Sequence, residues 1–376
     1  MTELASLFLI VLLVYLLQCI CWVSPRAIVF ALGIRGRGRR RSHNFVWNAF
    51  DTAGLIANPL PPLAPLLVAQ WPAFELTPDF IQFEGKDTKD AKEGDPVCIP
   101  WDKLQITHSE SKLVCNGSPA FKGSESQVLQ YADLLRQLQQ ARRAQRGQII
   151  QDWLRKMTNT QAASRRLRVF VRKSRWLRII ANFELLFLFL LIPLAFERFG
   201  TGILWRVILM LVLISVTVAL EFWTLHKAMF PAAGGQRFKS GITILLSPMA
   251  AIRACDSVAR DLLSGYHPLA VAGALLLEEE FRRFAGEQLR LCRFGDYFDK
   301  QYQTTLQKVM ERAIRQKEID PEELLQPPEH ESGCVVYCPR CLAQYTKQRT
   351  ECSDCGYESV AAFDHVAQFG KPQEKR

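Results

Sequence analysis

Two long apolar runs that follow one another closely constrain this chain more than any other feature of its sequence. The first extends from Trp176 to Phe196 and the second from Ile203 to Trp223, with six residues, 197–202, between them. A helix needs about 20 apolar residues to cross the hydrocarbon layer of a bilayer, and both runs are too continuously apolar for a surface helix of a soluble domain. The sequence therefore predicts a transmembrane helical hairpin with a short turn. A pair of buried core helices is the alternative.

A third apolar run occupies the N-terminus, from Leu4 to Val23, and Pro25 and Arg26 follow it. Its length also matches the hydrocarbon layer. A cleaved signal peptide is the alternative, but such a peptide has a basic start and small residues at its cleavage site. The start is instead acidic at Glu3, which favours a retained anchor and a total of three spans.

The positive charge of the chain is concentrated beside these runs. Residues 24–41 carry a net charge of +6 and residues 142–178 carry a net charge of +11. Because the whole chain carries +10, the remaining residues together carry −7. Because basic segments stay on the cytoplasmic side, the N-terminus and the turn at 197–202 are predicted outside a plasma or bacterial inner membrane, and the rest inside. Anionic lipid headgroups are the expected partner of the two basic segments. Nucleic acid is a less favoured partner, because no recognition motif accompanies the charge.

Several ionisable residues lie within the predicted hairpin. Arg178 and Glu221 are at equal distance from the centre of the turn, and we expect them to pair at the cytosolic interface. Arg206 lies one turn into the last span and is expected to extend its guanidinium toward the outer headgroups.

Glu184 lies about two turns deeper than Arg178 and opposite Ser215. A carboxylate within the bilayer is costly, so Glu184 is a candidate functional residue. The alternative, which we favour, is that Glu184 lies near the headgroups and reaches Arg178 or Lys227.

Residues 73–140 have a different pattern, in which short apolar or alternating runs are separated by turn signals, as in a β-meander. A helix follows, with Ser124 and Gln127 spaced as a capping box. This arrangement and the segment Ile99–Leu104 (IPWDKL) resemble the small pleckstrin-homology-like domains of bacterial membrane proteins. The resemblance implies an interaction or lipid-proximal role and provides no catalytic residues.

The C-terminal region holds the most specific motif. Cys338 and Cys341 form one C-x-x-C turn, and Cys352 and Cys355 form a second one after ten intervening residues. Two such turns supply four thiolates to a tetrahedral Zn²⁺, a closed set that indicates a structural metal. Gly356 permits the left-handed turn after the second pair. The module resembles a zinc ribbon; a rubredoxin-like iron site and dithiol redox chemistry are the alternatives.

The predicted fold is therefore a three-span α-helical membrane protein with a small β-rich cytosolic domain, a helical C-terminal region and a zinc ribbon. The expected segments are an N-terminal span at 1–23, a basic, proline-rich linker at 24–72, the β-rich domain at 73–140, a basic amphipathic helical segment at 141–175, the hairpin at 176–223, a helical region at 224–330, the ribbon at 331–362 and a flexible tail at 363–376. Within them, the proline-rich 51–72 is a candidate re-entrant segment, and 241–255 a candidate interfacial or buried helix.

The sequence contains no P-loop, dinucleotide-binding glycine fingerprint, H-E-x-x-H or G-x-S-x-G motif. The leading hypothesis is a non-enzymatic membrane anchoring or scaffold protein that presents cytosolic interaction modules to protein partners. A membrane enzyme or transporter subunit that uses intramembrane carboxylates is one alternative, and a membrane-tethered nucleic-acid-binding protein is another.

Overall fold

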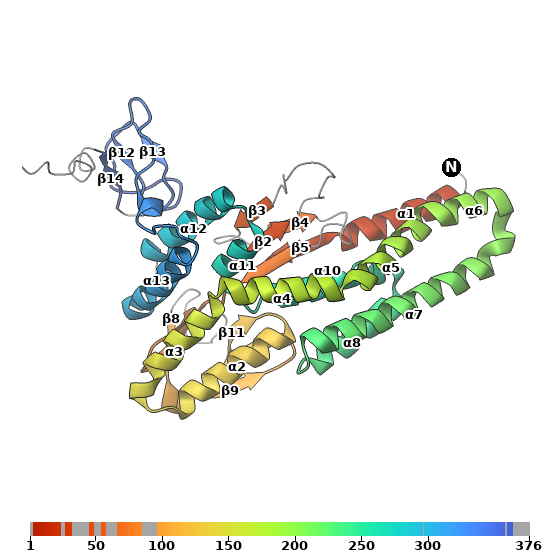
Figure 1. Cartoon of the computed structure of the whole chain (residues 1–376), viewed down its shortest axis with the longest axis horizontal. Coiled ribbons are helices and arrows are strands. Elements are labelled where there is room, and N and C mark those ends of the chain that lie inside the picture. The colour runs from red at the N-terminus through yellow and green to blue at the C-terminus, as the bar shows by residue number, and fades with distance from the viewer. Residues whose placement is uncertain are drawn as a thin grey trace, which may run out of the picture.

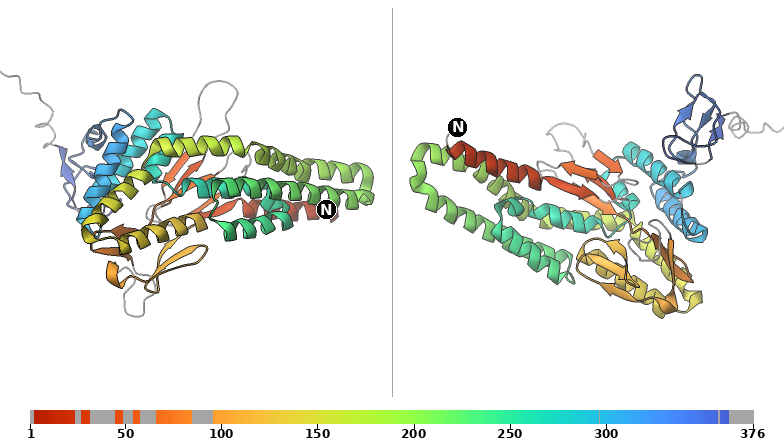
Figure 2. Two further views of the ribbon diagram at one scale, coloured as in Figure 1. Left: turned by 60° about the horizontal axis from the view of Figure 1, so that its bottom comes forward. Right: turned by 180° about the vertical axis from the view of Figure 1, so that it is seen from behind.

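The computed structural model describes residues 3–23, 27–31, 45–48, 54–57, 66–84, 96–295, 297–357 and 359–363. Over these residues the protein is mostly helical, with small antiparallel sheets (Figure 1). The molecule is elongated, with a helical hairpin at one end, a small C-terminal module at the other and a mixed body between them (Figures 1 and 2). The predicted arginine-rich stretch at 35–41 and the tail beyond residue 363 lie outside the described residues.

The N-terminal helix is shorter than the predicted span. Helix α1 comprises Glu3–Gln18, which corresponds to about 24 Å. The last part of the apolar run, Ile20–Val23, is instead strand β1, which pairs antiparallel with β4 (Gly54–Ala57). Its β-branched and aromatic residues suit an extended strand once a partner edge is available. Among the described residues only one helical stretch, 175–229, is long and apolar enough to cross a membrane, so three separate spans are not shown.

That stretch folds back on itself as a hairpin. One leg contains α5 (Arg175–Leu186), the π-helical turn η2 (Phe187–Leu191) and α6 (Ile192–Phe199), and the other is α7 (Leu204–Met229). The chain reverses at the short helix η3 (Gly200–Ile203), where Gly200 has φ +62°. The turn therefore falls where the sequence predicted it.

The predicted β-meander and helix are present. Strands β6 (Phe74–Leu76), β7 (Phe80–Glu84) and β8 (Pro96–Pro100) form one sheet, and β9 (Ile106–His108), β10 (Lys112–Cys115) and β11 (Ser118–Lys122) form a second. Helix α2 (Glu125–Gln140) follows, with the predicted capping box at Ser124 and Gln127. The sequence did not predict β11, because Pro119 indicates a turn. A register shift in its pairing with β10, between Leu113 and Val114, accompanies this proline.

The segment expected to be a linker contributes a sheet of its own. Strand β2 (Ala27–Ala31) pairs with both β3 (Phe45–Asn48) and β5 (Leu66–Gln70). Side chains of β2 and β5 are buried in the main core of the body, beside helix α10 (Ala254–Leu263). Short apolar strands between basic and proline-rich stretches are difficult to distinguish from a linker by composition.

The basic segment before the hairpin forms two helices, α3 (Arg143–Met157) and α4 (Thr160–Lys173). The predicted apolar stripe of α3 is present, but its central residues, Ile150, Trp153 and Leu154, are buried in the protein core. This stripe is therefore used for packing within the protein and does not face lipid headgroups.

The C-terminal helices complete the same body. They are α8 (Gly234–Leu246), α9 (Pro248–Ile252), α10, α11 (Pro268–Leu275), α12 (Glu278–Arg293) and α13 (Lys300–Arg315), followed by the short 3-10 helix η4 (Glu323–Leu325). One continuous hydrophobic core contains side chains from these helices, from α2 and α3 and from the sheets. The residues on either side of the hairpin in the sequence therefore fold together.

One buried and one half-buried carboxylate also join the two parts of the body. Glu75, on β6, is 5% exposed and accepts hydrogen bonds from the backbone N–H groups of Phe298 and Asp299 at 3.0 and 2.7 Å, at the start of α13. Glu125, at the start of α2, accepts one from Gln236 N at 2.6 Å, in the first turn of α8. An acid at a helix N-terminus interacts favourably with the helix dipole.

A second, smaller core holds the hairpin end of the molecule together. It contains buried side chains of α1 and of the residue that follows it, of both hairpin legs and of α9, namely Tyr15, Cys19, Leu188, Ile192, Val207, Met249 and Ile252. Helix α1 therefore packs beside the hairpin, and its N-terminal end lies near α6 (Figure 1).

Candidate metal centre

The four cysteines of the C-terminal motif lie on two turns of a small module. Its strands are β12 (Val336–Tyr337), β13 (Gln344–Tyr345) and β14 (Ala361–Ala362), in the order β13-β12-β14. Cys338 follows β12 directly, and the backbone N–H of Cys338 donates to Ala343 O at 2.9 Å. The short strands therefore hold the first turn in place from both sides.

The two turns have the same backbone geometry. The residue after the second cysteine of each pair, Leu342 or Gly356, has φ +66°. Its N–H donates to the carbonyl of the first cysteine of the pair, at 2.8 Å for Leu342 to Cys338 and 2.9 Å for Gly356 to Cys352. The left-handed conformation was predicted for Gly356. It was not predicted for Leu342, because leucine rarely adopts it.

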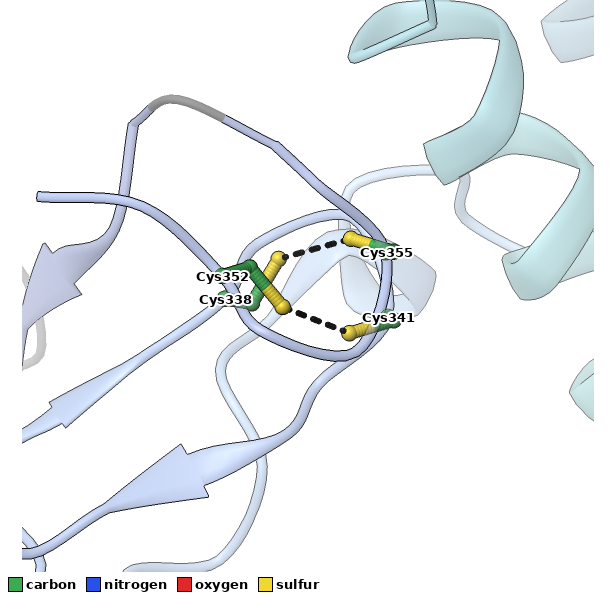
Figure 3. A group of neighbouring side chains, drawn as sticks. All are labelled: Cys338, Cys341, Cys352 and Cys355. Atoms are coloured by element: carbon green, nitrogen blue, oxygen red, sulfur yellow. Dashed lines mark hydrogen bonds between the residues drawn. The ribbon is translucent and has the colours of Figure 1, made fainter.

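The four sulfur atoms converge on one point (Figure 3). The Sγ atoms of Cys338 and Cys355 are 3.6 Å apart, those of Cys341 and Cys352 are 3.5 Å apart, and all four lie within 4.8 Å of one another. A zinc ion bound tetrahedrally by sulfur at about 2.3 Å would separate its ligands by about 3.8 Å. The spacing therefore fits a tetrahedral ion, and four protein sulfurs leave no open coordination position.

The surroundings of the cluster disfavour four free thiolates. Burial raises the pKa of the Cys355 thiol to about 11 and also raises that of the Cys341 thiol. Burial opposes ionisation of Cys352 as well, but hydrogen bonds from Tyr345 and from backbone N–H groups lower its pKa to about 6, so this thiol ionises readily whereas those of Cys341 and Cys355 do not. A bound divalent cation would reverse this preference, since metal binding stabilises the deprotonated ligands. The Tyr345 hydroxyl lies 2.9 Å from the Cys352 Sγ. His330 and Cys334, which we did not expect to be ligands, lie outside the four-sulfur group, and the His330 ring contacts the Cys334 carbonyl.

The candidate residues of the hairpin are not brought together. Glu184 is fully buried on α5, and the Ser215 hydroxyl donates to its Oε1 at 3.2 Å, so the two residues face each other as predicted. The favoured expectation that Glu184 reaches Arg178 or Lys227 is wrong, because its other oxygen, Oε2, is buried without a partner among the described residues. The predicted pair of Arg178 and Glu221 is wrong, because Arg178 Nη2 donates instead to Val171 O at 3.0 Å and no ion pair of Glu221 occurs among the described residues. Helix α5 directs the Arg178 side chain away from α7, back toward the end of α4. Arg206 is exposed near the turn end of α7.

Sequence reasoning missed a group of polar residues on α8 and α10. Lys239, Arg253, Asp256 and Arg260 line a cavity beside the end of α1. The sequence showed only that 241–255 is apolar, and the cavity forms where side chains of α8 and α10, which α9 joins in the chain, approach one another. No signal in one sequence predicts that approach.

Comparisons with models of protein families, with characterised proteins and with solved structures found no match. The resemblance of residues 73–140 to a pleckstrin-homology-like domain therefore stays a prediction. The four-cysteine cluster remains the feature with the most specific chemistry.

Proposed function

We propose that this chain is a membrane-anchored, non-enzymatic scaffold protein that holds a structural zinc ribbon at a distance from the bilayer for protein interactions. The observation that carries the proposal is the separation of two surfaces. The apolar hairpin and the four-cysteine module lie at opposite ends of the molecule, with the body between them (Figures 1 and 2).

The exposed surface of the hairpin supports membrane insertion. Of the 18 consecutive residues of the hairpin that are most apolar, only 17% are buried inside the protein, whereas a core helix of a soluble protein would be mostly buried. Large apolar side chains are exposed along α7 from Leu204 to Trp223, a length of about 30 Å, which equals the hydrocarbon thickness. Trp205 near the turn and Trp176 and Trp223 near the body are exposed at the two ends of this surface, where aromatic residues favour the interfaces.

Helix α1 supports an arrangement of three membrane helices. Seven of its large apolar side chains, from Leu9 to Leu17, are exposed although the helix packs against the hairpin. Its N-terminal end and the hairpin turn lie at the same end of the molecule (Figure 1). This arrangement agrees with an N-terminus and a turn outside the membrane, and a body and ribbon in the cytosol.

A structural role suits the zinc. The ion would join the turn that begins at Cys338 to the turn that begins at Cys352, 14 residues later, in a module with only short strands. The free energy of metal binding then becomes free energy of folding for that module. The ribbon can present a fixed surface without taking part in chemistry.

The test compares the partners that the full-length protein captures in cells by proximity labelling. The variant Cys341→Ser/Cys355→Ser loses two zinc ligands, and Cys98→Ser, at an exposed cysteine outside the cluster, is the matched control. The proposal predicts that the double variant stays in the membrane fraction and loses its partners, whereas the control keeps them. Retention of the same partners by the double variant would overturn the proposed role of the ribbon.

A membrane enzyme or transporter subunit is the second candidate, and Glu184 favours it. Its Oε2 is buried and has no hydrogen-bond partner among the described residues, which leaves an acceptor available between the hairpin legs. This candidate predicts that cells with Glu184→Gln lose the activity or growth that the native protein supports, and that cells with Ser215→Ala keep it at a reduced level. A neutral Glu184→Gln variant would remove the support for this candidate.

A further inference from the structure

A cavity of about 440 Å³ that is lined in part by charged and hydroxyl side chains opens beside the membrane-facing end of the body. Helices α8, α9 and α10 and the last residue of α1, Gln18, surround it. Three basic side chains line it, Lys239, Arg253 and Arg260, and the hydroxyls of Ser240, Thr243 and Ser257 lie between them. The cavity belongs neither to the metal cluster nor to the buried pair in the hairpin.

The charges of this cavity are unbalanced. Arg253 Nη2 lies 2.8 Å from Asp256 Oδ2, so one cation is paired. Lys239 and Arg260 form no ion pair with any residue that the structure describes. The lining therefore carries a net charge of about +2, which favours an anion with several oxygen acceptors, such as a phosphate group.

Asp256 adds a second requirement for the ligand. It is only 4% exposed; its Oδ2 is paired with Arg253 Nη2 at 2.8 Å, whereas its Oδ1 accepts no hydrogen bond from a described residue. A buried acceptor without a donor is costly, so a ligand that also donates a hydrogen bond would be favoured there. The cavity thus suits a molecule with a phosphate at one position and a hydroxyl or amino group at another.

The position of the cavity indicates the source of that molecule. Its wall α8 exposes Phe238, Ile242 and Leu245 on the side facing α7, where they line an apolar groove with Trp223. The cavity and the apolar groove therefore lie on two sides of α8, at the level of the exposed Trp223. Exposed tryptophans mark the expected level of lipid headgroups.

We propose that this cavity binds the headgroup of an anionic phospholipid. The phosphate oxygens accept hydrogen bonds from Lys239, Arg253 and Arg260, and a headgroup hydroxyl or amino group donates to Asp256. The inference rests on the proposed membrane insertion and specifies the lipid class that the anchored protein selects.

The test titrates the full-length protein, purified in a neutral detergent, with three short-chain lipids and one soluble compound. The lipids are phosphatidylglycerol, which has the phosphate and donor hydroxyls, phosphatidylmethanol, which has the charge without the donor, and phosphatidylcholine, which has neither net charge nor donor. Glycerol 3-phosphate supplies the headgroup chemistry without acyl chains. Calorimetry is expected to give affinities in the order phosphatidylglycerol, phosphatidylmethanol, phosphatidylcholine.

The variant Lys239→Gln/Arg260→Gln removes the two unpaired cations of the cavity. Lys227→Gln/Arg172→Gln removes the same charge from exposed positions that do not line it. The proposal predicts a loss of phosphatidylglycerol affinity of about tenfold or more for the first variant and less than twofold for the second. Equal losses in both variants, or equal affinity of the native protein for phosphatidylglycerol and phosphatidylcholine, would overturn it.

Two further results separate the possible failures. If glycerol 3-phosphate binds as tightly as phosphatidylglycerol, the site recognises a soluble phosphate compound and the lipid assignment is wrong. Flotation of the native protein with vesicles tests membrane insertion by itself. If the native protein floats with vesicles but shows no headgroup preference, the cavity assignment alone is overturned. If the native protein does not float with vesicles, the membrane anchor on which the assignment rests is overturned.

Discussion

Replacing Gly356 with alanine tests whether the backbone of the second cysteine turn and its metal are coupled. Gly356 has φ +66°, and a Cβ added there would meet no atom within 4 Å. The substitution therefore adds no steric clash with neighbouring groups. It acts only through the left-handed backbone, which L-residues with a Cβ disfavour.

The magnitude follows from two opposing terms. The left-handed conformation costs a non-glycine residue about 1–2 kcal/mol. Alanine restricts the unfolded chain more than glycine does, which returns about 0.4–1 kcal/mol. The net loss is about 1 kcal/mol. If folding of the turn and binding of zinc are one process, this loss corresponds to an increase of about fivefold in the zinc dissociation constant.

The assay is competition for zinc between the full-length protein and a chromophoric chelator of known affinity. Gly117→Ala is the matched control, because Gly117 has φ +82° in the turn between β10 and β11 and also has no atom within 4 Å of an added Cβ. The control should lose similar stability in the body and keep the native zinc affinity. An unchanged zinc affinity in Gly356→Ala, or an equal loss of zinc affinity in both variants, would show that the backbone of this turn and zinc binding are not coupled.

Substitutions at three further positions test the body. His267→Asn should keep the cap of α11 and flatten the pH dependence of stability. Burial lowers the pKa of His267 to about 3, so the stability that the neutral imidazole contributes is present above pH 6.5 and lost as pH falls toward 3. Parallel curves of thermal midpoint against pH for the native protein and the variant would contradict this. Trp101→Phe should cost about 1–3 kcal/mol in denaturant unfolding, because the buried indole donates to Thr77 O at 2.9 Å; a loss below 0.5 kcal/mol would show that the bond contributes little. Glu75→Ala should lower the free energy of unfolding by about 3 kcal/mol and Glu75→Gln should lower it less, because the carboxylate accepts hydrogen bonds from two N–H groups at the start of α13. Equal losses in the two variants would assign the effect to packing.

The sequence predicted those parts of the structure that local chemistry determines. The capping box at Ser124, the turn of the hairpin, the left-handed Gly356 and the convergence of the four cysteines each follow from residue types at fixed spacing. Glu184 faces Ser215 for the same reason, since two antiparallel helices joined by a short turn fix which residues lie at equal depth.

The sequence did not predict features that depend on distant partners. Ile20–Val23 is a strand because β4 supplies an edge, and the run is otherwise suited to a continuing helix. The stripe of α3 is buried because the body surrounds it, although the same pattern is typical of a helix on a membrane surface. Arg178 could reach Glu221 by depth alone, but its direction on α5 takes it to Val171.

Collision rates of spin labels at two positions show whether the hairpin lies in a bilayer while the body remains in water. A genetically encoded spin-labelled residue is placed at Leu213, which is 55% exposed in the middle of α7, and in a separate sample at the exposed Gln301 of α13, with the protein reconstituted in vesicles. We expect the label at Leu213 to collide with dissolved oxygen far more than with a water-soluble nickel complex, and the label at Gln301 to show the reverse. Free access of the nickel complex to the label at Leu213 would show that the hairpin is not in the bilayer.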